Sequence, residues 1–199
     1  MGVIPVEYVG REDYLTQAAQ SPIKLEYENG EVVAMAGTTT EHNRICLNVA
    51  SALERVAKPG CQVFAMDVRV EAAESKSYFY PDALLVCGPL LYNTDNPPSL
   101  LNPSIIVEVL SASNSVFDML TKLDAYKAIP SVIDILYIDS TFYQVRVYSR
   151  RADGWDLSAY INQFTDVPLP GSNLVLPMAA IYKGLVYNPG SKLLELVQP

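Results

Sequence analysis

The chain has 199 residues, of which 50% are hydrophobic and 18% charged, a composition typical of a globular protein and not of a disordered one. Its formal net charge of −8 argues against a broad, nonspecific nucleic-acid surface, because such surfaces neutralise phosphates with lysine and arginine. A small cleft that holds a cation against a phosphate is still compatible with an acidic protein.

The sequence gives no sign of membrane insertion or export. No apolar run approaches the roughly 20 residues that a membrane-spanning helix needs. The first seven residues lack the basic and apolar regions of a signal peptide. We therefore expect a cytoplasmic protein without a membrane partner, built as a single domain over residues 1–199.

Three cysteines, Cys46, Cys61 and Cys87, lie far apart among apolar residues. The chain has no CxxC pair and only one histidine, which argues against a structural zinc site. We expect all three cysteines to be buried, reduced thiols.

The first forty residues predict a short helix and a hairpin. Residues 11–20 fit a helix that the Ser-Pro pair at 21–22 ends. Asn29-Gly30 stands between two short runs, 25–28 and 31–34, and this pair is a strong signal for a type I′ turn.

A long helix follows, and Thr38 with Glu41 fits a capping box at its start. Its apolar residues recur on one face, and the Pro-Gly pair at 59–60 ends it. Alternating apolar residues over 64–70 then predict a strand with one solvated side, and residues 78–87 predict another strand.

The second half of the chain has the pattern of a parallel crossover. Strands are predicted at 105–110 and 132–139, and the helix between them, at about 115–128, would join them as parallel neighbours. The connection 88–103 contains four prolines and has the length of a mobile loop over a site. The remaining segments predict β-structure: a strand pair at 143–149 and 155–161, and a proline-broken tail at 166–199.

Two carboxylates lie in apolar, strand-like runs. Asp82 follows Pro81 at the start of one run, and Glu108 lies inside another. An ionised carboxylate is costly to bury alone, so each must be neutralised, paired or bound to a cation. Taken singly, Asp82 fits a turn and Glu108 fits a salt bridge. Together they favour a hard-cation site for Mg²⁺, Mn²⁺ or Ca²⁺, to which the carbonyl of Val109 would add an oxygen.

Lys122 lies on the helix after Glu108, in a stripe with Asp118 and Tyr126. An exposed Asp–Lys pair fits this spacing. A site role fits it too, because the helix starts near the carboxyl end of the Glu108 strand, where open α/β sheets bind ligands. His42, the only histidine, points inward from the first turn of its helix, as either a core histidine or a contact to phosphate or water.

Other catalytic classes lack their motifs. The sequence has no GxSxG elbow, Walker loop or GxGxxG segment, and one histidine limits Ser/His/Asp arrangements. Glu26 and Glu41 are weaker candidates for acids around the site, because nothing in the sequence singles them out.

These residues resemble a known family, the restriction-endonuclease-like proteins of the Uma type, a bacterial branch of the PD-(D/E)XK nuclease superfamily. The order and spacing of the matching segments extend over most of the chain. The segments that carry the chemistry are YPD at 80–82, IVEVLS at 106–111, DMLTK at 118–122, and Tyr126.

The resemblance implies an α/β fold with a restriction-endonuclease-like mixed central sheet flanked by helices, an N-terminal β-hairpin and a C-terminal β extension. It makes Asp82 and Glu108 metal ligands. The superfamily's usual lysine two positions after the acid is replaced by Leu110 here. In this branch the lysine comes from the following helix, which matches Lys122.

The implied activity is a Mg²⁺- or Mn²⁺-dependent endonuclease that cuts nucleic acid, DNA first of all, and leaves 5′-phosphate and 3′-hydroxyl ends. Lys122 would orient the attacking water or stabilise the transition state, with His42 and Tyr126 as accessory residues. A homodimer would supply two sites for two strands.

The chain departs from the family in two places. Met119 stands where an arginine is common, which would weaken phosphate binding, and residues 111–114 lack the usual proline and threonine. The acidic charge and Met119 favour an alternative, a nonenzymatic nuclease-fold module that binds or regulates.

Overall fold

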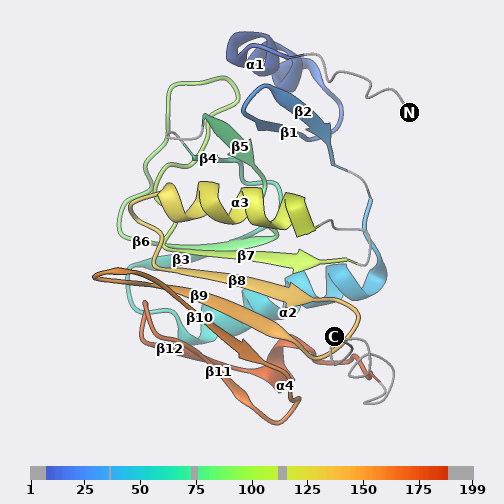
Figure 1. Ribbon diagram of the computed structural model, residues 1–199, viewed down its shortest axis with the longest axis vertical. Coiled ribbons are helices and arrows are strands. Elements are labelled where there is room, and N and C mark those ends of the chain that lie inside the picture. The colour runs from blue at the N-terminus through green and yellow to red at the C-terminus, as the bar shows by residue number, and fades with distance from the viewer. Residues whose placement is uncertain (1–7, 36, 73–75, 112–115, 188–199) are drawn as a thin grey trace.

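The chain forms a central six-stranded mixed sheet, a four-stranded antiparallel sheet and a C-terminal β-hairpin (Figure 1). A computed structural model describes residues 8–35, 37–72, 76–111 and 116–187. The expected α/β fold with a mixed central sheet, an N-terminal hairpin and a C-terminal β extension is confirmed.

The central sheet has the strand order β10-β9-β8-β7-β6-β3. Strands β7 and β8 are parallel neighbours, and the other pairs in this sheet are antiparallel. The helix α3 (Val116–Ala128) joins β7 to β8, so the predicted crossover is confirmed. The strands are β3 (Cys61–Ala65), β6 (Ala83–Cys87), β7 (Ile105–Leu110), β8 (Asp134–Asp139), β9 (Val145–Arg151) and β10 (Gly154–Tyr160).

The second sheet lies at the N-terminal end of the molecule beside α1 (Figure 1). The predicted helix and hairpin are confirmed, and Asn29 and Gly30 have the positive φ angles, 43° and 103°, that a type I′ turn requires. The elements of this region are α1 (Arg11–Gln20), β1 (Leu25–Glu28), β2 (Glu31–Ala34), β4 (Val70–Ala72) and β5 (Ser77–Phe79).

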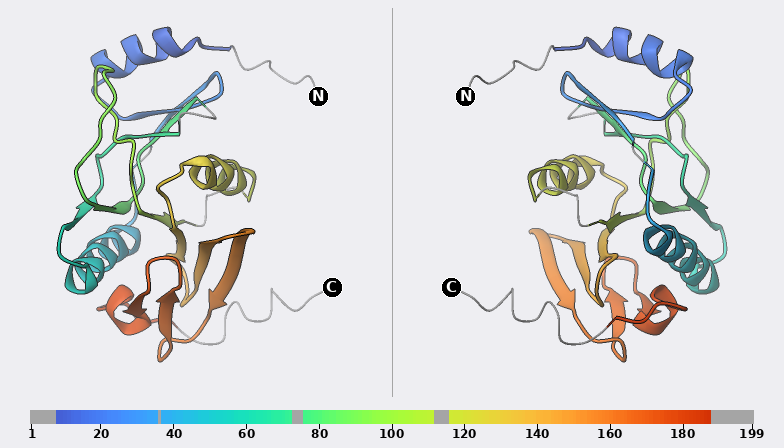
Figure 2. Two further views of the ribbon diagram at one scale, coloured as in Figure 1. Left: turned by 90° about the vertical axis from the view of Figure 1, so that its left-hand side faces the viewer. Right: turned by 90° about the vertical axis from the view of Figure 1, so that its right-hand side faces the viewer.

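Two helices cover opposite faces of the central sheet (Figure 2). The apolar face of α2 (Thr40–Val56) packs on one side, and α3 packs on the other. Because both faces are covered, β7 and β8 are almost entirely buried, which explains their continuous apolar sequences. The C-terminal hairpin, β11 (Asp166–Leu169) and β12 (Leu174–Pro177), and the short helix α4 (Met178–Ile181) extend the core on the α2 side.

Two predicted strands are each split between the sheets, so their predicted extents were wrong. The 64–70 run breaks at Met66 and Asp67, whose φ angles of 53° and 64° are left-handed, and the chain passes from β3 in the central sheet to β4 in the N-terminal sheet. The 78–87 run is likewise divided into β5 and β6. An alternating pattern continues through a corner and does not reveal a change of sheet.

The cap of α2 also differs from the prediction by one residue. Thr39, and not Thr38, is the N-cap, and its side-chain oxygen accepts a hydrogen bond from the backbone N–H of His42 at 3.2 Å. This bond fixes the first turn, from which His42 projects.

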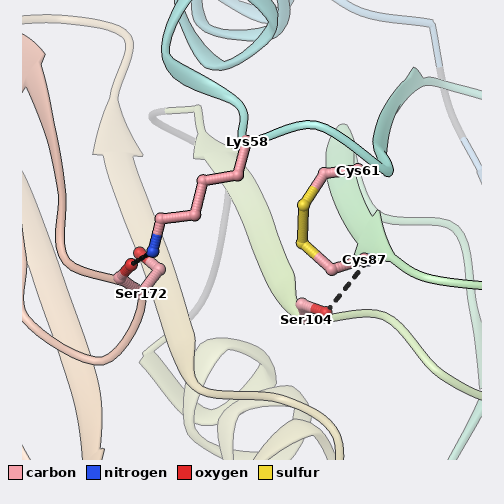
Figure 3. The surroundings of a disulfide bond; sticks show 5 residues. All are labelled: Lys58, Cys61, Cys87, Ser104 and Ser172. Atoms are coloured by element: carbon pink, nitrogen blue, oxygen red, sulfur yellow. Dashed lines mark hydrogen bonds between the residues drawn. A yellow bond between two sulfur atoms is a disulfide. The ribbon is translucent and has the colours of Figure 1, made fainter.

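A disulfide joins Cys61 to Cys87, so the prediction of three reduced thiols was wrong (Figure 3). The two residues are direct partners in the β3–β6 register, with their Cα atoms 4.0 Å apart, which brings the sulfurs within bonding distance. Cys46 is the free cysteine, and it is buried as expected.

The connection 88–103 packs against the N-terminal sheet, which differs from the predicted mobile loop over a site. Leu100 forms bridges with Val70 and Tyr92, and the carboxylate of Asp95 makes a salt bridge to Arg11 on α1 at 2.8 Å. None of the helices in the described parts of the chain is long and apolar enough to cross a membrane.

Candidate active site

The register of the central sheet brings the two predicted acids together. Strands β6 and β7 are antiparallel, and their last pair is Ala83 with Val107. If this register is extended by one step, Asp82, the residue just before β6, lies opposite Glu108 near the carboxyl end of β7. Residues opposite each other on neighbouring strands have Cβ atoms about 5 Å apart, so the two side chains are neighbours.

Glu108 lies deep in the sheet, with 8% of its surface exposed. The phenol of Tyr126, on α3, donates a hydrogen bond of 2.6 Å to its Oε1 atom. Burial raises the pKa of Glu108 to about 8, with further contributions from the carboxylates of Asp82 and Glu26, while the ammonium of Lys122 opposes the shift. A cation bound beside this carboxyl would favour its ionised form.

Asp82 is oriented by two groups from different elements. The backbone N–H of Val109 donates to its Oδ2 atom at 2.7 Å, and Nε2 of His42 lies 3.4 Å from the same oxygen. The sequence predicted Val109 as a ligand through its carbonyl; the contact given by the structure is through its N–H. His42 is partly buried and in contact with Asp82, so of its two interpretations the structure favours the site residue.

Lys122 forms a largely buried ion pair, so it is not the exposed lysine of one interpretation, and the side chain of Asp118 lies outside the described residues. Its Nζ atom lies 2.7 Å from Oε2 of Glu26 on β1, and only 14% and 10% of the two side chains are exposed. The other oxygen of Glu26 accepts the backbone N–H of Tyr80 at 3.0 Å. The ammonium also lies 5.5 Å from the ring centroid of Phe79.

Glu26 is thus a site residue that the sequence did not single out. It alternates with Tyr27 on β1, and a strand directs successive side chains to opposite faces. The sequence signal was a glutamate at an alternate position of a hairpin strand, and this pattern is common at solvent-exposed positions as well. Glu41, the other weak candidate, lies exposed in the first turn of α2.

The assembled groups carry an excess of negative charge. Glu26, Asp82 and Glu108 face one lysine, so the formal charge with all four groups ionised is 1 − 3 = −2, leaving the imidazole out of the count. These oxygen donors are the type that hard divalent cations prefer. A divalent cation would balance the charge, so the residues present fit the metal that the family resemblance implies.

His42 also contacts Cys46, one helical turn later on α2. Its Nδ1 atom lies 3.4 Å from the Cys46 sulfur, and the ligand atoms of His42, Cys46 and Asp82 all lie within 4.8 Å of one another. The order thiol, imidazole, carboxylate is that of a cysteine nucleophile. However, Cys46 is 0% exposed, and burial together with Asp82 raises its pKa far above the usual value. The thiol is therefore an inert core group.

Met119, the position that departs from the family pattern, contacts an arginine from another strand. Nη1 of Arg146, on β9, lies 3.5 Å from the Met119 sulfur. The phenol of Tyr137, on β8, donates to the backbone carbonyl of Met119 at 3.0 Å. A cation is therefore present beside the first turn of α3, although the helix itself does not supply it.

Comparison with known proteins gives consistent matches. The chain matches the Uma2 family, described as a putative restriction endonuclease, over residues 11–179. Two relatives, both called uncharacterized, come from Synechocystis sp. (strain ATCC 27184 / PCC 6803 / Kazusa). The protein sll1609 is 31% identical over 169 residues, which cover 84% of this chain and 96% of the relative. The protein slr1290 is 26% identical over 186 residues, covering 92% and 96%.

The fold also matches a solved structure, described as a putative nuclease belonging to DUF820 from Anabaena variabilis ATCC 29413. The TM-score is 0.69, and the match covers 87% of this chain and 97% of that chain at 17% sequence identity. At this identity the likeness establishes the fold alone. Together with the match over residues 11–179, it confirms the resemblance seen in the sequence: the chain belongs to the Uma2 family of putative restriction endonucleases.

Proposed function

We propose that the protein is a metal-dependent endonuclease that hydrolyses phosphodiester bonds of nucleic acid, with DNA as the first substrate to test. The observation that carries this proposal is the charge imbalance at the end of β7, where three carboxyl groups face one lysine. The proposal treats residues 1–199 as one nuclease-like domain, and family membership supports the same class of activity.

Asp82 and Glu108 would hold the cation, Mg²⁺ or Mn²⁺, with the carbonyl of Val109 as a further candidate ligand. When bound, such an ion activates a water molecule and stabilises negative charge on the phosphate. The protein orients both carboxylates in advance: Val109 N–H holds one oxygen of Asp82, and the Tyr126 phenol holds one oxygen of Glu108. Fixed ligand positions reduce the reorganisation that binding requires.

Lys122 would place a positive charge next to the reacting phosphate. Glu26 holds its ammonium through the 2.7 Å ion pair, and the site keeps both groups largely out of water. A charge in such an environment acts more strongly than one at the surface. His42 fixes Asp82 from the α2 side and would take an accessory role.

The test is cleavage of plasmid DNA, single-stranded DNA and RNA in Mg²⁺ or Mn²⁺. The variants are Asp82→Asn and Glu108→Gln, which preserve shape and remove the ligand charge. Glu71→Gln is the matched control, because Glu71 is another largely buried carboxylate, with 13% of its side chain exposed, in the N-terminal sheet.

We expect the wild type and Glu71→Gln to cleave, and each site variant to lose about 10³-fold in rate, the equivalent of several kcal/mol of transition-state stabilisation. The products should carry 5′-phosphate and 3′-hydroxyl ends. Cleavage that survives in both site variants would overturn the proposal. Binding without cleavage by the wild type would favour a nonenzymatic module. A two-strand cut would further predict a homodimer, which light scattering can test.

A further inference from the structure

A row of side chains crosses the central sheet and continues beyond the two acids. Glu108 on β7 is paired with Tyr137 on β8, and Tyr137 is paired with Arg146 on β9. Paired residues on neighbouring strands project to the same face of a sheet. Asp82, Glu108, Tyr137 and Arg146 therefore form one row, with the acids at one end and a guanidinium group two strands further on.

Arg146 lies at the same edge of the sheet as the acids. It is the second residue of β9, which runs antiparallel to β8, so it lies beside the carboxyl ends of β7 and β8. Strands are spaced about 4.8 Å apart, which separates the backbones of Glu108 and Arg146 by about 10 Å. The long side chain of Arg146 can span part of this separation.

The guanidinium of Arg146 has weak partners among the described residues. Its contacts are the sulfur of Met119 at 3.5 Å and Oε1 of Gln144 at 3.3 Å, and no described carboxylate lies within 4.0 Å of it. The Met119 thioether is a poor hydrogen-bond acceptor, and the hydrogen bond to the Gln144 amide oxygen is long. The guanidinium of Arg146 carries five N–H donors in a planar arrangement, so it can still bind a stronger acceptor.

Two other arginines on β9 differ in this respect. Arg150, on the same strand, donates to the carbonyls of Val132, Lys127 and Ile129 at 2.7 to 2.8 Å. Arg151 pairs with Asp156 at 2.8 Å. These two side chains have structural partners of normal length, whereas Arg146 does not.

The outer side of Arg146 is open. Its partner on β10 is Ala159, a small and exposed residue, and Arg146 itself is partly exposed. On the inner side, the Tyr137 phenol donates a hydrogen bond to the Met119 carbonyl in the first turn of α3. This bond fixes the turn whose Met119 sulfur contacts the guanidinium. A planar, positioned guanidinium that faces solvent fits a phosphate group in two-point contact.

We infer that Arg146 is a substrate-binding residue that contacts a phosphate of the nucleic-acid strand next to the one being cleaved. The inference rests on the proposed function and extends it from the reacting phosphate to the neighbouring one. If a few basic residues near the site supply the positive charge that binds phosphate, a net charge of −8 over the whole protein is compatible with nucleic-acid binding. Arg146 would bind and orient the strand and take no part in the chemical step.

The experiment compares Arg146→Ala and Arg146→Lys with wild type, and Arg151→Ala serves as the control on the same strand. Steady-state cleavage in Mg²⁺ gives KM and kcat, and fluorescence anisotropy with single-stranded and duplex oligonucleotides in a chelating buffer gives binding without turnover. Both are measured over a range of salt concentrations. Circular dichroism checks that each variant folds.

For Arg146→Ala we expect KM and the dissociation constant to rise about tenfold, kcat to change less than threefold, and the salt slope to fall by about one. Arg146→Lys keeps the positive charge but loses the two-point contact of a guanidinium. Its affinity should therefore lie between those of Arg146→Ala and wild type, and its salt slope should equal that of wild type. Arg151→Ala should match wild type.

Two failures are distinguishable. If wild type cleaves and Arg146→Ala keeps its KM and salt slope within twofold, the inference about Arg146 is wrong and the proposed function stands. If wild type neither cleaves nor binds any of the probes, the proposed function fails and the role of Arg146 fails with it.

Discussion

Two regions of the molecule bury charged side chains, and they do so with different balances of charge. In the N-terminal sheet, Arg69 is 3% exposed and lies over the rings of Tyr14 and Tyr78, while Arg11 pairs with Asp95. Glu71 completes this group, with its oxygen accepting the side-chain amide of Asn93 at 2.7 Å. This group holds two arginines and two carboxylates, of which Arg11 pairs with both acids, so its formal charge is 2 − 2 = 0.

At the end of β7 the same count gives 1 − 3 = −2 among the described residues, with the His42 imidazole again left out, because Glu26, Asp82 and Glu108 lie near Lys122. Buried charge as such is therefore a poor marker of function in this protein. Structural ion pairs neutralise each other, whereas a site for a cation keeps an excess that only the ligand removes. The difference between the two regions leads to three predictions.

The largest effect should come from a substitution in the balanced region, which is the group of Arg11, Arg69, Glu71 and Asp95 in and beside the N-terminal sheet. Arg69→Met removes a guanidinium that bonds to Ser99, Tyr14 and the Pro97 carbonyl, and it leaves Arg11 alone with two carboxylates. We expect the free energy of unfolding to fall by about 3–5 kcal/mol, measured by urea denaturation. The rate of cleavage per folded molecule should stay within threefold of wild type. A large loss of rate at unchanged stability would show that the balanced region takes part in catalysis.

A somewhat smaller effect should follow from removing Lys122, the lysine that lies near Glu26, Asp82 and Glu108. Lys122→Met keeps an unbranched side chain and leaves three carboxyl groups without a lysine, so the pKa of Glu108 should rise further. We expect kcat to fall about 10²-fold, as for other groups that stabilise transition-state charge. Lys127→Met, on the same helix over the Tyr148 ring, is the matched control and should stay near wild type. Equal losses in both variants would mean that helix packing, and not charge, accounts for the effect.

The smallest effect concerns stability without metal. The pKa of Glu108 is about 8 in the folded protein against an ordinary value of 4.5, so the folded chain binds more protons than the unfolded chain between these values. Its stability should therefore fall as pH rises from about 5 to about 8, with a slope of at most about 1.4 kcal/mol per pH unit from this group. Thermal unfolding in a chelating buffer measures the slope.

Glu108→Gln cannot ionise at this position, so it should lose that slope and should be more stable than wild type at pH 8. Glu71→Gln should keep the slope, because Glu71 belongs to the balanced region. If wild type and Glu108→Gln showed the same pH dependence, the pKa of Glu108 would not be raised in the folded protein, and this prediction would fail.

The sequence predicted the parts of this site that have a local energetic cost. Glu108 lies in an unbroken apolar run and needs a partner wherever that strand packs, so it could be recognised as a candidate site residue without a structure. The helix α3 and the parallel pair β7–β8 followed from spacing, and they placed Lys122 near the same sheet edge.

Features that depend on pairing between distant segments could not be predicted in this way. Glu26 reaches Lys122 across 96 positions of sequence, since 122 − 26 = 96, and nothing near it shows which way β1 faces. The Cys61–Cys87 disulfide depends on the register of β3 with β6. The split of the 64–70 run depends on the left-handed backbone at Met66 and Asp67, which an apolar pattern does not reveal.

Strand β1 has a consequence for the design of chimeric proteins. Tyr27 points into the tyrosine cluster of the N-terminal sheet, and its neighbour Glu26 points to Lys122 on α3. A crossover placed between β2 and α2 would look harmless, because it cuts between two regular elements. It would nevertheless exchange the acid that holds the lysine while leaving the lysine behind. The β1–β2 hairpin and α3 should therefore be taken from the same parent protein when a chimera is built.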